Sequence, residues 1–369
     1  MTRQRREQLC REMAAHGWTA TAIVPGPSLY YLTGLSVHRS ERLTIAFVLA
    51  DGRLALLIPA LEQSRVEAKQ LPDSRLFPFA DADGPDAALQ SLVQEMDLQD
   101  VRLAVEFHGM WVGEERALQA AGAGIDLLPA DDMLAQLRMT KDDAELGAMR
   151  RAVAIVEAAL AETMAGLKPG QTERQVAADL QVALLRQGTE SPPFQPIVVS
   201  GPNGALPHAI PGDRPIRSGD MVTIDCGASW NGYVSDITRN LAVGAVDPDL
   251  LAIHQIVREA NAAGRAAARP GVPAEEVDHA ARDVIARAGF GDFFVHRTGH
   301  GLGLEIHEPP YIVEGNAEPL QVGMTFTIEP GIYVPGLGGA RIEDDVVITE
   351  DGAESLTRFP RELRTVASS

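Results

Sequence analysis

The amino-acid sequence predicts an α/β domain over residues 1–135, followed by an α+β domain over residues 136–369. In the first part, strand-like apolar runs alternate with amphipathic helical segments, which is the pattern of an α/β layer. After residue 188, strand-like runs joined by glycine-rich turns carry clustered histidine, aspartate and glutamate residues. A chain of 369 residues is long enough for two domains and needs no disulfide framework to support its core.

The composition excludes several classes of protein. The 51 acidic and 32 basic residues give a formal net charge of −19, and this field would repel a nucleic-acid backbone. No apolar run is long enough to cross a membrane, and the charged N-terminal segment lacks a signal-peptide core. The two cysteines, Cys10 and Cys226, are too few for a disulfide scaffold or a thiolate metal site. A cytoplasmic protein is therefore expected, with neither nucleic acid nor membrane as partner.

The N-terminal domain shows scaffold elements and no chemical motif. A helix is expected over residues 3–16, and Asp51-Gly52 joins two β-rich runs as a strong hairpin signal. A strand at 101–107 and a helix near 111–121 follow. Because no glycine-rich phosphate loop occurs among these elements, this domain is expected to be a scaffold or a lid.

The helices of the C-terminal domain carry recognisable start signals. Asp142 or Asp143 can cap a first helix, and Thr172 with Gln175 can form a capping box for a second. Two more helices are expected at 248–268 and 273–289. Each pair of helices precedes a strand hairpin with two acidic residues, which indicates an internal duplication.

The segment MVTIDCGASWNGYVSDITRN predicts a hairpin with two aspartates on one face. Asn231-Gly232 is the preferred pair for a two-residue type I′ turn. With that turn Asp225 faces Thr238 and lies diagonally across from Asp236, close enough for both to reach one cation. Two solvent-exposed carboxylates are the alternative, but β-branched, burial-prone residues surround each aspartate.

The segment HRTGHGLGLEIHEPP holds three histidines. His296 and His300 have the spacing of a zinc-binding helix, but the glycines around His300 disfavour a helix and instead allow a close backbone approach. His307-Glu308 is followed by two prolines, which excludes a zinc-protease helix there. The glycine run does not open a helix either, so it is no dinucleotide fingerprint. His300 is a candidate ligand, with a structural histidine as the alternative.

The last acidic group lies in MTFTIEPGIYVPGLGGARIEDDVVIT. Glu329 is expected at the end of an apolar strand. The next strand places Arg341, Glu343 and Asp345 on one face, and Asp344 points the other way. A solvated acidic turn is the alternative for this segment. However, Glu343 lies among apolar residues, and a buried carboxylate needs a cationic partner or a metal.

These three segments together supply four carboxylates and one imidazole: Asp225, Asp236, His300, Glu329 and Glu343. Like charges suppress each other's ionisation, so such a group is too negative for an empty pocket. Two divalent ions would neutralise it. Hard oxygen ligands with one histidine and no thiolate suit manganese, cobalt, iron or zinc, and dinuclear centres of this kind are typical of hydrolases.

The five residues, in this order and with GHGLGLEIHE, TIEPGIY and RIEDD around them, resemble the pita-bread metallopeptidases, in the branch of aminopeptidase P and prolidase. The resemblance is strong over residues 140–369, and the first 135 residues, with YYLTGL at 30–35, are similar to the creatinase-like N-terminal domain. It implies a pita-bread catalytic domain with a pseudo-twofold internal duplication. It also implies two divalent metal ions, with manganese as the first choice.

The resemblance also implies a role for each ligand. Asp225 would hold one metal, Asp236 and Glu343 would bridge both, and His300 and Glu329 would complete the other. Glu329 is also similar to the family's general base for the attacking water.

Three further residues match family positions on the substrate side. His208, in SGPNGALPHAI, and His307 match histidines that contact the substrate. Arg341 matches an arginine that orients carboxylates or substrate. Spacing by itself gives no reason to select His208.

The activity implied by the resemblance is release of the N-terminal residue from a peptide whose second residue is proline, carried out by a homodimer. Some prolidases have an arginine shortly after the second histidine that can hold the carboxylate of a dipeptide, and this chain has Tyr311 in that stretch. An Xaa-Pro aminopeptidase is therefore the main expectation. The alternatives are an Xaa-Pro dipeptidase (prolidase) and a hydrolase or lyase of a small non-peptide metabolite; a non-enzymatic peptide-binding module would not be expected to keep all five ligands.

Overall fold

The computed structural model describes residues 2–124 and 126–367. The chain divides into two units, Met1–Arg138 and Met139–Ser369, which are described separately below. A strand is also expected from the sequence over residues 125–130; residue 125 lies outside the described residues, and residues 126–129 form a strand. No helix in the described part of the chain is long and apolar enough to cross a membrane.

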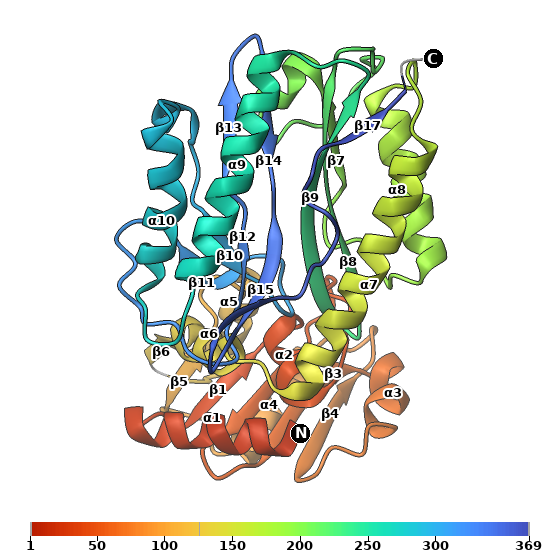
Figure 1. The fold of residues 1–369 in the computed structure, drawn as a ribbon. Helices are drawn as coiled ribbons and strands as arrows, with labels where there is room; N and C mark the ends of the chain where they lie inside the picture. The colour runs from red at the N-terminus through yellow and green to blue at the C-terminus, as the bar shows by residue number, and fades with distance from the viewer. Residues whose placement is uncertain (1, 125, 368–369) are drawn as a thin grey trace. The chain divides into compact units, whose positions relative to one another are not determined.

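Six strands of the first unit form one mixed sheet in the order β4-β3-β2-β1-β5-β6 (Figure 1). Their bounds are β1 Ala20–Ile23, β2 Ile45–Leu49, β3 Leu54–Pro59, β4 Ser74–Phe79, β5 Arg102–Val105 and β6 Asp126–Pro129. The expected hairpin at Asp51-Gly52 joins the antiparallel strands β2 and β3. Phe47, Leu57 and Leu103 are fully buried in the core of this sheet, as an α/β layer requires.

The helices expected at 3–16 and near 111–121 are confirmed, and further helices that were not predicted individually accompany them. They are α1 Thr2–His16, α2 Pro27–Thr33, α3 Gln63–Glu67, α4 Asp86–Glu95, α5 Val112–Ala120 and α6 Asp131–Met139. Leu89, Leu92 and Val93 of α4 pack into the core of the sheet.

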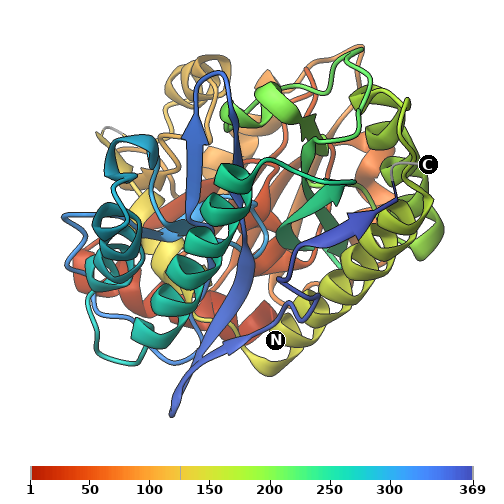
Figure 2. The same cartoon turned by 45° about the horizontal axis from the view of Figure 1, so that its top comes forward.

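The second unit has two helix pairs around its strands. The first pair is α7 Asp143–Gly166 and α8 Glu173–Gln187, and the second is α9 Pro248–Ala267 and α10 Ala274–Arg287. Figures 1 and 2 show α7 and α8 on one side of the strands and α9 and α10 on the other. Of the two possible caps for the first helix, Asp142 is the one used, and it forms a capping box with Glu145; the expected capping box of Thr172 with Gln175 is also present.

The strands of the second unit form three sheets, with the orders β17-β9-β8-β7, β11-β10-β12-β15-β16 and β13-β14. The first contains β7 Ile197–Ser200, β8 Met221–Trp230, β9 Tyr233–Val243 and β17 Arg364–Val366. The second contains β10 Gly299–Gly301, β11 Glu308–Ile312, β12 Thr325–Ile328, β15 Asp344–Thr349 and β16 Gly352–Ser355. The third is the hairpin of β13 Gly331–Val334 and β14 Gly338–Arg341.

The β8–β9 hairpin has the register that the sequence predicts. Asn231 and Gly232 both have positive φ, at 50° and 76°, as a type I′ turn requires. Asp225 pairs with Thr238 and Gly227 with Asp236, so both aspartates lie on one face.

The second acidic pair is arranged differently from the expected simple hairpin. Glu329 directly follows β12 and Glu343 directly precedes β15, and these strands pair with each other. The β13–β14 hairpin is inserted between them and ends at Arg341. The expected single strand through 341–345 is therefore broken, because the chain has to leave one sheet and enter another. Glu329 and Glu343 still come together at the same end of a strand pair.

Glycines allow the backbone to close tightly around His300. A Cβ atom at Gly299 would lie 1.8 Å from the carbonyl oxygen of Thr327. At Gly301 the corresponding distance to the carbonyl oxygen of Pro309 would be 2.3 Å. Any side chain at either position would push β10 away from its neighbours, so the expected close approach around His300 is confirmed.

We expect Gly299→Ala to lower the free energy of unfolding by about 1–3 kcal/mol or more, because the added methyl group overlaps backbone atoms. Urea unfolding followed by circular dichroism would measure the change. Gly147→Ala in α7 is the matched control, because a Cβ there meets no atom within 4 Å; a gain of about 0.5–1 kcal/mol is expected there. Equal effects of the two substitutions would contradict the close-approach argument.

Candidate metal centre and substrate pocket

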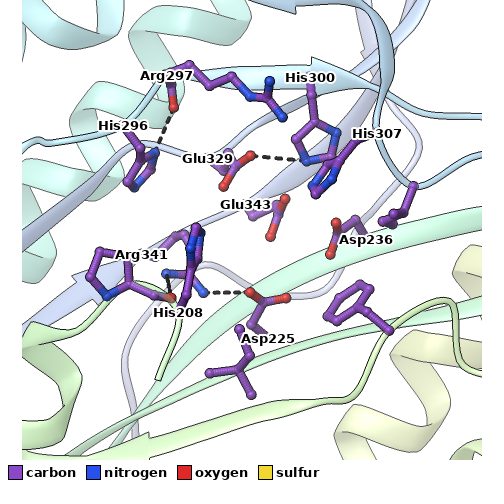
Figure 3. A pocket seen from close by; sticks show the side chains of 14 residues that line it. His208, Asp225, Asp236, His296, Arg297, His300, His307, Glu329, Arg341 and Glu343 are labelled. Carbon is purple, nitrogen blue, oxygen red and sulfur yellow. Dashed lines mark hydrogen bonds and ion pairs between the residues drawn. The ribbon is translucent and has the colours of Figure 1, made fainter. Parts of the chain in front are cut away.

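A cavity of about 450 Å³ in the second unit collects the residues singled out by the sequence (Figure 3). All eight of them line it: His208, Asp225, Asp236, His300, His307, Glu329, Arg341 and Glu343. They come from β8, β9, β10 and β14 and from the loops that flank β7, β11, β12 and β15. Segments separated by more than a hundred residues therefore build one polar pocket.

Three of these side chains form a group that could hold a metal ion. Ligand atoms of Asp236, His300 and Glu343 all lie within 4.8 Å of one another, and all three residues are buried. Glu343 Oε2 accepts a 2.6 Å hydrogen bond from the Thr238 hydroxyl. His300 Nδ1 lies 3.1 Å from the carbonyl oxygen of Gly301, which leaves Nε2 directed to the pocket. Hydrogen bonds of this kind orient the side chains of metal ligands before a metal binds.

The other two expected ligands lie beside this group. Glu329 Oε1 is 3.2 Å from His300 Nε2, and Asp225 Oδ2 is 2.5 Å from an Arg341 nitrogen. Burial by itself would raise the pKa of Glu329, but the hydrogen bond and the charge of His300 outweigh it and lower the pKa to about 2. Glu329 is therefore a carboxylate at neutral pH, as both a ligand and a proton acceptor must be.

Burial raises the pKa values of the other three carboxylates, Asp225, Asp236 and Glu343. Burial first, and then the neighbouring carboxylates, raise the pKa of Asp236 and of Glu343 well above the ordinary range. Burial also raises the pKa of Asp225, although Arg341 opposes it. Asp225 Oδ1 and Asp236 Oδ1 are buried and accept no hydrogen bond from any described residue. Buried oxygens without a hydrogen-bond partner, among carboxylates that repel one another, need positive charge nearby. Divalent cations fit this set of donor atoms.

All three side-chain nitrogens of Arg341 donate hydrogen bonds. Besides Asp225, its guanidinium donates to Thr238 Oγ1 at 3.2 Å, to the Tyr333 hydroxyl at 2.8 Å and to the Pro207 carbonyl at 3.3 Å. Of the two roles expected for Arg341, orienting a carboxylate is the one these contacts describe. The guanidinium has little donor capacity left for a substrate.

A histidine and a tyrosine that the sequence did not assign extend this network. Burial, opposed by Arg341, raises the pKa of Tyr333 to about 12, so its hydroxyl keeps its proton. That hydroxyl accepts from Arg341 and therefore donates to His296 Nε2, 2.9 Å away. The His296 Nδ1 proton then goes to the carbonyl oxygen of Arg297 at 2.7 Å. His296 is thus a neutral structural histidine, and the rejection of a zinc-binding helix agrees with this position.

A buried glutamate anchors the loop that carries His208. Glu173, at the start of α8, is fully buried. Its carboxylate accepts hydrogen bonds from the backbone of Ser200 at 2.8 Å and of Gly212 at 3.2 Å. The Asn203 amide also donates to it at 3.1 Å. Both ends of the loop are therefore fixed, and exposed His208 is presented at the pocket.

A buried ion pair anchors the loop that carries His307. Lys141 Nζ and Glu308 Oε1 are 2.7 Å apart, with only 1% and 2% of their side chains exposed. The ammonium also donates to the carbonyl oxygen of Met139 at 3.2 Å. His307 itself packs edge-on against His300, with ring centroids 4.2 Å apart. The ion pair thus fixes the residue next to His307.

Two arginines on the side away from the pocket bind Asp344, which directly follows Glu343. Asp344 turns away from the pocket, as expected, and binds Arg239 at 2.8 Å and Arg361 at 2.7 Å. Asp345 accepts a 3.0 Å hydrogen bond from the backbone of Asp236. These contacts hold the two strands that bear Asp236 and Glu343 at a fixed separation.

The geometry defines a metal-dependent hydrolase pocket, and comparison with known proteins identifies its class. Residues 147–350 match the family model described as metallopeptidase family M24, and residues 5–140 match the creatinase/prolidase N-terminal domain. The chain belongs to metallopeptidase family M24 and is a metal-dependent peptidase.

Individual relatives cover nearly the whole chain. An Xaa-Pro dipeptidase from Pyrococcus furiosus is 36% identical over 98% of this chain and 99% of its own length. A dipeptidase structure from Pyrococcus horikoshii covers 98% of this chain and 100% of its own, at 39% identity and a TM-score of 0.93. An X-Pro aminopeptidase structure from Thermotoga maritima covers 98% of this chain and 99% of its own, at 32% identity and a TM-score of 0.86. The expected fold class, an α/β domain with a pita-bread α+β domain, is confirmed.

Sequence reasoning missed the supporting residues of the site. The sequence predicted no role for Tyr333, Thr238 or Glu173, although Tyr333 ends the motif TIEPGIY and Thr238 faces Asp225 in the predicted hairpin. Their roles depend on contacts across long stretches of chain. Arg297 lines the pocket and was passed over, although it lies between His296 and the glycine run. Its position next to the expected ligand segment was the available signal.

We expect Asp236→Asn to lower the affinity for divalent metal at least about tenfold, because one charged ligand of the group becomes neutral. Equilibrium dialysis against Mn²⁺ followed by elemental analysis measures the bound metal. The control is Asp213→Asn, which changes a carboxylate whose side chain is 82% exposed. Unchanged metal content in Asp236→Asn would remove this residue from the metal site.

We expect Lys141→Met to lower the free energy of unfolding by about 3–5 kcal/mol, because Glu308 is left buried without its partner. The double substitution Lys141→Met/Glu308→Leu should recover most of that loss. In the exposed pair of Arg174 with Asp213, Arg174→Met should change the stability by less than about 1 kcal/mol. Chemical denaturation measures all three, and a double variant as unstable as the single one would contradict this account.

Proposed function

We propose that this protein is an Xaa-Pro dipeptidase that uses two divalent metal ions. The observation that carries the proposal is the convergence of four carboxylates and His300 in one pocket of about 450 Å³. This volume suits a small ligand rather than a folded protein substrate. Unpaired buried oxygens and raised pKa values in this donor set support metal binding.

The relatives favour the dipeptidase alternative over the aminopeptidase that was the main expectation. The Pyrococcus furiosus enzyme is named as an Xaa-Pro dipeptidase, and the Pyrococcus horikoshii structure as a dipeptidase. The aminopeptidase from Thermotoga maritima has the same fold, so the fold by itself does not separate the two activities. The expectation of an aminopeptidase rested on Tyr311, and a loop residue elsewhere in the pocket can supply the missing cation.

For the metal ions, we propose Asp225, Asp236, His300, Glu329 and Glu343 as ligands. Manganese is the first choice, because the set has oxygen donors, one imidazole and no thiolate, and cobalt, zinc and iron suit it next. When bound, two such ions would polarise the scissile carbonyl and make water a stronger nucleophile.

The protein's own residues would carry out the remaining steps. Glu329, ionised at neutral pH, would take the proton of the attacking water and pass it to the leaving proline nitrogen. Arg341 would hold Asp225 in place. His208 and His307, exposed at the pocket, would donate hydrogen bonds to the substrate carbonyl as charge develops on its oxygen.

Apolar residues that also line the pocket would bind the proline ring. These residues are Phe194, Ile197, Pro207 and Ile306. A rigid ring that loses little conformational entropy on binding suits such a surface.

We also propose that the enzyme works in the cytoplasm as a homodimer. Cys10 and Cys226 are both free, which supports a reducing compartment. The domain boundary near residue 135 and the dimeric state remain predictions.

We expect the Mn²⁺-loaded enzyme to hydrolyse an Xaa-Pro dipeptide with a kcat/KM at least about tenfold above that for the matching Xaa-Pro-Yaa tripeptide. Chelation should abolish both reactions. Preference for the tripeptide would replace the proposal with an aminopeptidase. Cleavage of neither peptide by metal-loaded enzyme would favour the non-peptide metabolite.

A further inference from the structure

We propose that Arg297 binds the free C-terminal carboxylate of the dipeptide substrate and so selects dipeptides over longer peptides; this inference rests on the proposed dipeptidase function. Arg297 lies two residues before β10, the strand that holds His300, and it lines the same cavity. Figure 3 shows its side chain extending along the pocket toward His300.

Arg297 differs from Arg341, the other arginine that lines the pocket, because its guanidinium has no hydrogen-bond or ion-pair partner among the described residues. Arg341 already donates to Asp225, Thr238, Tyr333 and the Pro207 carbonyl. Among the residues that the structure describes, the Arg297 guanidinium makes neither a hydrogen bond nor an ion pair. It is therefore the pocket cation with free donors, and a half-buried guanidinium with free donors can bind a carboxylate through two parallel hydrogen bonds.

The ring of Tyr311 supports the Arg297 side chain. The guanidinium carbon lies 4.6 Å from the centroid of that ring. Tyr311 pairs with His300 across β10 and β11, so both side chains lie on one face of the sheet. Stacking covers one face of the guanidinium and leaves its edge, where the N–H groups point, available to a ligand.

The stacking of Arg297 on Tyr311 explains how this chain could bind a carboxylate without an arginine in the stretch after His307. The stretch after His307 lacks the arginine that some prolidases use, and it has Tyr311 instead. The structure brings the cation to that place from Arg297, fourteen residues earlier in the chain. Tyr311 then serves as the platform for a cation supplied by the segment before β10.

The backbone around Arg297 is fixed on both sides. The His296 ring donates to the Arg297 carbonyl at 2.7 Å, and Arg282 donates to the His296 carbonyl at 2.9 Å. The backbone of Thr298 donates to Asp278 Oδ1 at 3.0 Å. A charged side chain that projects from a fixed backbone gives a defined distance between the carboxylate site and the metal ligands.

Charge distinguishes a dipeptide from a longer peptide in this pocket. A dipeptide that ends with proline carries its free, negatively charged carboxylate next to the proline ring, and a guanidinium binds such a group through charge-assisted hydrogen bonds. In a longer peptide the same position holds an uncharged amide. A cation at this distance therefore favours the substrate that ends with proline.

The test compares Ala-Pro with Ala-Pro amide, which lacks the carboxylate, in the Mn²⁺-loaded wild-type enzyme and in Arg297→Gln. We expect the variant to raise KM for Ala-Pro about 10- to 100-fold and to leave kcat/KM for the amide within about twofold, because one charge-assisted pair is lost. Hydrolysis of the amide and the metal content report whether the variant is folded. Arg297→Lys, which keeps the charge but loses the planar fork, should be impaired less than Arg297→Gln.

The outcomes separate the two proposals. If wild-type enzyme prefers the dipeptide and Arg297→Gln keeps that preference, or loses both activities equally, the role of Arg297 is wrong and the dipeptidase stands. Equal losses in the glutamine and lysine variants would also contradict a role for the charge. If wild-type enzyme does not hydrolyse Ala-Pro, the dipeptidase proposal fails and the inference fails with it. Arg287→Gln, on the exposed end of α10, is the control and should change neither substrate.

Discussion

The structure depends on the cost of burying several carboxylates in one place. Asp225, Asp236 and Glu343 are almost completely buried, and their mutual repulsion adds to their loss of hydration. Arg341 stabilises the Asp225 carboxylate and the Thr238 hydroxyl stabilises Glu343, but these contacts offset only part of the unfavourable free energy. Asp225 Oδ1 and Asp236 Oδ1 accept no hydrogen bond from the described residues, and in the proposed function divalent cations would be their partners.

Rigid support around the pocket follows from the same constraint. Carboxylates that repel one another would move apart unless the surrounding structure held them. Asp344 with Arg239 and Arg361 fixes the strand behind Glu343, and the Lys141–Glu308 pair fixes the loop of His307. These buried ion pairs lie outside the pocket and contribute to it through position rather than chemistry.

Selection of the substrate is separable from catalysis in this arrangement. The groups proposed to handle the proton and the metal are four carboxylates, on β8, on β9 and next to the ends of β12 and β15, together with His300 of β10. The group proposed to recognise the carboxylate is basic, lies two residues before β10, and is stacked on Tyr311 of β11. A change at Arg297 or Tyr311 can therefore alter the length of the preferred peptide and leave the metal ligands in place.

The sequence by itself determined the local geometry. Asn231-Gly232 set the register that puts Asp225 and Asp236 on one face, Asp142 and Thr172 set the helix starts, and the motifs identified the family. Only the tertiary structure decided how distant segments meet. The break between Arg341 and Glu343 follows from a change of sheet, and the stacking of Arg297 on Tyr311 follows from strand pairing. Periodicity and turn preferences act over a few residues, whereas these contacts join separate strands and loops whose approach is decided by the packing of the whole domain.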